Sequence, residues 1–167
     1  MSLVMHRLVG AIALRRDAFL WMLFNDRATG DALLLVAVTQ VVVWLGLGVP
    51  GGLDGFVRSL FGGAWLWIIV SGIAWAVARY FLDGDGSYAP VMRVTGFAFP
   101  TRIVLILVGF LEIPWQAGLI LGNLWFLLVI AAGVAVVMEI PRRKAAAAAA
   151  AGFGGYLVIE LVFGGLY

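Results

Sequence analysis

Long apolar stretches recur along this chain and constrain its fold more than any other feature. A membrane-spanning helix needs about 20 mostly apolar residues, with a range of roughly 17–25. Stretches that meet this requirement occur at approximately residues 31–47, 60–81, 90–111, 114–138 and 145–163. Glycine, proline and charged residues separate them, as is typical of helix ends. The sequence therefore predicts an all-α membrane protein, with a bundle of five transmembrane helices over residues 29–167.

The composition excludes the main alternatives. Hydrophobic residues make up 64% of the 167 residues and charged residues only 12%, whereas a soluble domain carries roughly 25% charged residues. The stretches also lack the alternating pattern of transmembrane β-strands. The chain has no cysteine and a single histidine, His6, and it contains no common catalytic or nucleotide-binding motif. We therefore expect no enzymatic activity, no metal, no cofactor and no nucleic-acid partner.

Residues 1–28 precede the first stretch and differ from it in pattern. One side of a helical wheel carries the apolar residues Val4, Met5, Leu8, Val9 and Ile12. The other side carries His6, Arg7 and Gly10. This pattern predicts one or two amphipathic helices lying at the membrane interface. A cleaved signal peptide is the rejected alternative, because the apolar run is short and no small-residue cleavage site follows it.

Basic residues fall almost entirely on one side of a five-span arrangement. Ten of the eleven lysines and arginines lie before the first span, between spans two and three, or between spans four and five. This count includes Arg102, whose side chain is expected to snorkel to the same side of the membrane. Arg58 alone falls on the other side. By the positive-inside rule, the N-terminus is then cytoplasmic and the C-terminus external.

The loop between the second and third stretches contains two aspartates in alternation. Asp83 and Asp85 resemble the first ligands of an EF-hand loop. However, Tyr88 and Val94 stand where that loop requires glycine and glutamate. A tight turn, followed by a helix with Pro90 in its first turn, explains the segment better.

The third stretch holds the most distinctive candidate site. Pro100 cannot donate a hydrogen bond to the carbonyl of Gly96 and crowds it, which predicts a kink. An unsatisfied carbonyl there, with Arg102 nearby, would make a polar site inside the bilayer. The alternative is a purely structural kink, with Arg102 snorkelling to the inner surface.

Glu160 is the acidic residue deepest within a span, and an intramembrane carboxylate is a functional candidate by default. Its depth of about 24 Å from Lys144 also fits the outer interface. Small residues occur as the pair Gly118 and Gly122 and as the run Ala145–Ala151. They predict close helix packing, either within the bundle or against a protein partner or second copy.

Several of these features together resemble the Yip1 family of small polytopic membrane proteins. They are the amphipathic lead-in, the five spans, the glycine- and aspartate-rich turn before span three, and the sequence Gly96-Phe97-Ala98-Phe99-Pro100. The resemblance extends from about Arg7 to Phe163. The aspartate-leucine-tyrosine-glycine-proline motif of eukaryotic members does not occur, and the alanine-, glycine- and arginine-rich composition fits a bacterial source.

The expected function follows from these interpretations together. We expect a non-enzymatic protein of the cell inner (plasma) membrane that organises or shapes the bilayer, or serves as an accessory subunit of a membrane complex. Its partners would be the lipid bilayer and a protein held through small-residue helix faces. The alternative is a small transporter or channel component that uses the Pro100 kink, Arg102 and Glu160.

Overall fold

The computed structural model describes residues 3–46, 51–104, 106 and 115–163, with the backbone alone for Leu3, residues 115–119, Glu160 and Phe163. These residues form helices and the turns between them, and no strand occurs among them. In chain order the helices are α1 (Leu3–Ile12), α2 (Arg16–Phe24), α3 (Ala28–Gly46), α4 (Gly52–Phe81), α5 (Tyr88–Ala98), the 3₁₀ helix η1 (Phe99–Ile103), α7 (Trp115–Val137) and α8 (Arg142–Phe163).

Three helices are long and apolar enough to cross a membrane by length and composition. They are α3, α4 and the segment Ile120–Val137 of α7, where the first, second and fourth spans are predicted. Helix α4 begins at Gly52, eight residues before the predicted start of the second span. Its 30 residues extend about 45 Å, more than the roughly 30 Å hydrocarbon core, so α4 must tilt or project beyond it. Gly51 starts this helix with a φ of 73°, which glycine adopts without strain.

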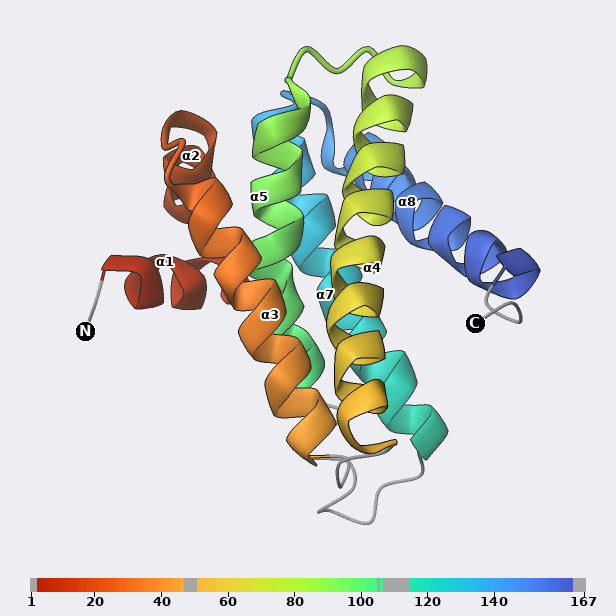
Figure 1. Ribbon diagram of the computed structural model, residues 1–167. Helices are drawn as coiled ribbons and strands as arrows, with labels where there is room; N and C mark the ends of the chain where they lie inside the picture. The colour runs from red at the N-terminus through yellow and green to blue at the C-terminus, as the bar shows by residue number, and fades with distance from the viewer. Residues whose placement is uncertain (1–2, 47–50, 105, 107–114, 164–167) are drawn as a thin grey trace.

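The third and fifth predicted spans coincide with α5–η1 and with α8. The third is α-helical only to Ala98 and continues as the 3₁₀ helix η1, while its predicted end lies outside the described residues. Helix α8 begins at Arg142, three residues before the predicted start. In Figure 1, α3, α4, α5 and α7 run side by side, whereas α8 crosses them obliquely.

The core centres on α5, which packs against α3, α4 and α7. Its residues from Pro90 to Ala98 are all buried except Met92, which is partly exposed. At the start of η1, Phe99 meets Phe126 of α7 edge to face, with ring centres 5.5 Å apart. A helix covered on nearly every side needs an apolar sequence all round, and this explains the continuous apolar composition of span three.

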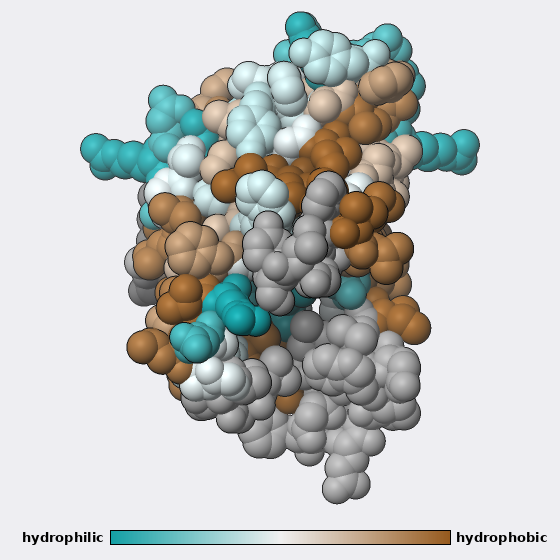
Figure 2. Space-filling model, turned by 45° about the vertical axis from the view of Figure 1, so that its right-hand side comes forward, coloured by the Kyte–Doolittle hydropathy of each residue, from teal (hydrophilic) through white to brown (hydrophobic). Residues whose placement is uncertain are grey.

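The outward faces of the bundle are also apolar. Exposed large side chains include Leu33 and Leu34 of α3, Phe61 and Trp65 of α4, Leu124 and Trp125 of α7, and Leu157 and Val158 of α8. In Figure 2, hydrophobic residues cover the flanks, and hydrophilic ones gather mainly at the upper end. An apolar surface of this extent is unstable in water and is suited to lipid.

Helices α1 and α2 form a hairpin, the N-terminal hairpin (Leu3–Phe24), that packs on α5 and α7. Figure 1 shows α1 running across the direction of α3. Leu8, Phe19 and Met22 are buried, whereas Met5 and Val9 are about half exposed. The placement of Gly10 on the polar side is wrong: Gly10 is buried, and a Cβ there would lie 3.1 Å from the Cβ of Ala18. The second helix covers this side of α1, which a single-helix wheel cannot show.

Candidate functional site

Arg93 ties the N-terminal hairpin to the bundle. It lies in the second turn of α5 and is 5% exposed. Its Nη1 donates to the carbonyl oxygens of Met22 at 3.0 Å and Leu23 at 3.4 Å. Its Nε donates to Thr29 Oγ1 at 2.8 Å, and its Nη2 forms an ion pair with Asp26 Oδ1 at 2.6 Å. One guanidinium thus joins the last turn of α2, the following turn and the start of α3.

The chemistry of a helix end explains why arginine suits this position. The last carbonyls of a helix have no partner within that helix, and the carbonyls of Met22 and Leu23 are of this kind. A guanidinium offers five donors in a planar fork and so can satisfy carbonyls, a hydroxyl and a carboxylate together. The Asp26 side chain is 99% exposed, so the carboxylate stays hydrated and only one of the two charges is desolvated.

The sequence interpretation missed this role, because it treated Arg93 only as a charge near a loop. A usable signal was present. Arg93 stands between Met92 and Val94 inside an apolar stretch, and such a residue pairs with another side chain or with backbone carbonyls. The segment Asn25–Thr29 is rich in acceptors, but its distance in sequence gave no indication that it would meet α5.

The loop at residues 82–87 is fixed by ion pairs. Lys144 of α8 binds Asp83 Oδ2 at 3.0 Å, and Arg79 of α4 binds Asp85 Oδ1 at 2.5 Å. The backbone N–H of Asp85 donates to the carbonyl of Met138 at 3.2 Å. The loop is therefore a tight turn joined to the α7–α8 turn, and its aspartates neutralise neighbouring cations. We call this end of the bundle the 82–87 end.

Gly96 lies at a close approach of α5 to α3. A Cβ at this position would lie 2.6 Å from the Cβ and 3.1 Å from the Cα of Ala32. The backbone N–H of Phe99 donates to the Gly96 carbonyl. The prediction that Pro100 leaves this carbonyl unsatisfied is therefore wrong. The chain tightens into a 3₁₀ turn, whose i→i+3 hydrogen bond replaces the one that proline cannot make.

Arg102 lies beside an aromatic ring at the end of η1. Its Cζ lies 6.0 Å from the centre of the Phe99 ring, within the range of a cation–π contact. It follows Tyr88, the first residue of α5, by fourteen positions, or about 21 Å of helix. That distance separates Arg102 from the 82–87 end, and the expected snorkelling of its side chain to the inner surface stays a prediction. Thr101 satisfies its own hydroxyl by donating to the Ala98 carbonyl at 2.7 Å.

The small residues of α8 serve packing within the chain. Ala145, Ala148 and Ala149 are buried, and a Cβ at Gly152 would lie 2.6 Å from the Val70 carbonyl oxygen of α4. The alanine face of α8 is thus covered by protein, in particular by α4. Gly122 is buried as well, whereas Gly118 and the side chain of Glu160 lie outside the residues whose side chains the structure describes.

Buried polar groups elsewhere donate hydrogen bonds to backbone carbonyls of their own or a neighbouring helix. Ser71 and Thr95 donate to carbonyls four residues back at 2.7 and 2.9 Å, and Trp67 Nε1 donates to the Met92 carbonyl at 2.7 Å. In the part of the chain that the structure describes, no group of three or more histidines, aspartates or glutamates is placed to hold a metal ion. Of the candidate residues, the structure brings Gly96, Pro100 and Arg102 together as neighbours along α5 and η1.

Comparison with protein families supports this architecture. The family model described as the Yip1 domain matches residues 10–164. Comparison with curated proteins and with solved structures gave no match. The matched region includes Arg93 and its hydrogen-bond partners, the 82–87 loop and the segment Gly96–Pro100. The apolar helices indicate a membrane protein. The chain therefore belongs to the Yip1 family.

Proposed function

We propose that this chain is a non-enzymatic, five-span protein of the cell inner membrane that shapes or organises the bilayer around it. The observation that supports the proposal most directly is the N-terminal hairpin, which Arg93 fixes to one half of the bundle. Phe19 of the hairpin approaches Val94 and Gly133. The hairpin therefore lies beside the half of the bundle that ends at residues 82–87, which we call the 82–87 half. The hairpin adds two helices to that half.

A protein that is wider in one leaflet favours a bilayer that bends around it. Helices that insert shallowly into a single leaflet bind in a curvature-dependent manner. Met5 and Val9 are about half exposed on α1, and the proposed role places them at the acyl boundary. The N-terminal hairpin therefore supplies the asymmetry that the membrane-shaping role requires.

The distribution of charge supports a cytoplasmic position for the 82–87 end. Nine of the eleven basic residues lie in the hairpin region, beside the 82–87 loop or at the α7–α8 turn, namely Arg7, Arg15, Arg16, Arg27, Arg79, Arg93, Arg142, Arg143 and Lys144. The positive-inside rule then places the N-terminus in the cytoplasm and the C-terminus outside. A C-terminal reporter that is active only in the cytoplasm should be silent, and an active reporter would contradict the five-span arrangement.

Reconstitution tests the membrane-shaping role. The purified protein in vesicles should produce smaller or tubular vesicles, measured by electron microscopy at matched protein density. Replacing the exposed pair Met5 and Val9 by glutamine should return the vesicles toward the protein-free size, because it removes acyl contact without altering the buried face of the hairpin.

The matched control lies at the opposite end of the bundle. Leu53 and Val57 are likewise exposed and one turn apart on α4, and replacing both by glutamine should leave the curvature effect in place. Vesicles that the wild-type protein does not alter would contradict membrane shaping. A partner that travels with the protein through mild-detergent purification, identified by mass spectrometry, would then favour the accessory-subunit role.

A further inference from the structure

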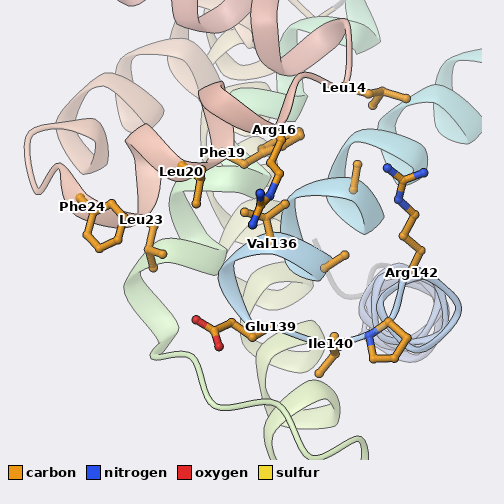
Figure 3. Close-up of a pocket in the computed structure, with 13 residues that line it drawn as sticks. Leu14, Arg16, Phe19, Leu20, Leu23, Phe24, Val136, Glu139, Ile140 and Arg142 are labelled. Carbon is orange, nitrogen blue, oxygen red and sulfur yellow. The ribbon is translucent and has the colours of Figure 1, made fainter.

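A groove on the surface of the 82–87 half has the properties of a lipid site. It lies between α2, the last turns of α7 and the α7–α8 turn, and its volume is about 630 Å³. Small-molecule sites usually enclose roughly 300–1,000 Å³. Figure 3 shows the groove with Arg16 and Arg142 on the two sides of α7.

Small residues of α7 make the hollow. Ala132 and Ala135 line the groove, where larger side chains would fill the space between α2 and the start of α8. Leu20 and Leu23 of α2 line it as well. The apolar part of this groove suits an acyl chain, because a hydrocarbon chain loses no hydrogen bonds there.

Charged side chains line the same groove as the alanines and leucines. Arg16 and Arg142 are exposed, and neither forms an ion pair with a described residue, whereas five other basic residues pair with aspartates. Glu139 also lines the groove. Two arginines and one glutamate give these side chains a net charge of +1, which complements a headgroup with a single negative charge.

We propose that this groove binds a singly anionic glycerophospholipid of the phosphatidylglycerol type. Arg16 and Arg142 would attract the phosphodiester by charge from the two sides of the groove, and one acyl chain would lie along the alanine-lined part. The glycerol hydroxyls would donate hydrogen bonds to the Glu139 carboxylate, a contact that phosphatidylcholine cannot make. This binding requires membrane insertion but is independent of the curvature effect, so either can fail while the other holds.

Mass spectrometry of the intact protein from mild detergent tests the proposal. With equal amounts of phosphatidylglycerol, phosphatidylethanolamine and phosphatidylcholine, the wild-type protein should retain one phosphatidylglycerol in preference. Replacing Arg16 and Arg142 together by glutamine should lower that retention by roughly tenfold or more, given the attraction per basic residue at an anionic surface.

The control removes the same charge outside the groove. Arg27 and Arg143 are exposed, form no ion pair with a described residue and do not line the groove. Replacing both by glutamine should leave retention within about twofold of the wild-type value, since the net charge of the groove is unchanged. An equal loss in both double variants would show general electrostatic attraction and overturn the site.

A second variant tests the apolar part without changing charge. Ala135→Phe should fill the groove and abolish preferential retention, while the unfolding temperature in detergent shows that the protein remains folded. Retention unaffected by Ala135→Phe, equal retention of all three lipids, or no retained lipid would each overturn the proposal.

Discussion

Arg93 and Arg102 lie nine residues apart on the same predicted span, and the structure treats them in opposite ways. Arg93 is buried and binds two carbonyls, a hydroxyl and a carboxylate. Arg102 is partly exposed and lies over the ring of Phe99, with no ion pair to a described residue. The difference arises from their neighbours, because Arg93 faces the end of α2 and the start of α3, whereas Arg102 lies over an aromatic ring.

This comparison shows that depth along a span does not by itself predict the role of a charge. A helix end supplies acceptors that need donors, so a buried arginine beside one stabilises the fold. Arg102 lies over an aromatic ring, and a cation–π contact of this kind is weaker than hydrogen bonds from a guanidinium to carbonyls and a carboxylate. The chain therefore uses one arginine to join helices and holds the other in a minor packing contact.

The largest expected effect comes from removing the hydrogen bonds and the ion pair of Arg93. Arg93→Gln should lower the free energy of unfolding in mixed micelles by about 2–4 kcal/mol, since hydrogen bonds from a charged donor contribute about 1.5–3 kcal/mol each and glutamine can replace only part of them. Hydrogen exchange of the amides in α1 and α2 should rise more than that of α7, because the hairpin loses its attachment.

Arg93→Lys serves as the matched control. Lysine keeps the charge and the pair with Asp26 but lacks the planar fork, so its effect should lie between the wild-type protein and Arg93→Gln. If Arg93→Gln unfolds like the wild-type protein, with unchanged exchange in the hairpin, the hairpin is held by apolar packing alone.

Particular residues show how far the sequence could be interpreted. The spans containing α3 and α7 were predictable because long apolar runs between breaks leave few alternatives. The start of α4 was not, since Gly52 and Gly55 look like a break in sequence and only the positive φ angles of Gly51 and Gly52 show where the turn ends. The contact of Arg93 with Asp26 depends on tertiary packing, which the local pattern does not contain.

Gly96 allows a test of the close approach between α5 and α3. Gly96→Ala should destabilise the protein by about 1–3 kcal/mol, because the added Cβ meets backbone atoms of Ala32 that cannot move aside easily. Gly72→Ala in α4 is the control. A Cβ there has no neighbour within 4 Å, so the change should be neutral or stabilising by up to about 1 kcal/mol. Equal effects of the two substitutions would show that Gly96 is not a packing glycine.

Pro100→Ala separates two explanations of the kink by the sign of its effect. If Phe99 already satisfies the Gly96 carbonyl, alanine adds flexibility to the unfolded chain and should cost about 0.4–1 kcal/mol. If that carbonyl lacked a partner, the new N–H of alanine would restore a hydrogen bond and stabilise the protein by about 1 kcal/mol. Unfolding in mixed micelles should show a small loss, and a gain would reinstate the polar site.

The smallest effect is expected at Arg102. A cation–π contact at a partly exposed site contributes about 0.5–1 kcal/mol, and Arg102→Gln also removes a charge that the surrounding apolar groups disfavour, so the net change in stability should be below about 1 kcal/mol. Glu160→Gln, which removes only charge, should be equally mild and leave assembly unchanged.

Both variants belong in a flux assay with the purified protein in liposomes, because solute transport is the alternative role for these two charges. Loss of a wild-type flux in either variant, with assembly unchanged, would show that the weakly held arginine or the glutamate acts on a solute. The contrast with Arg93 would then be one between a residue that joins helices and a residue that serves transport.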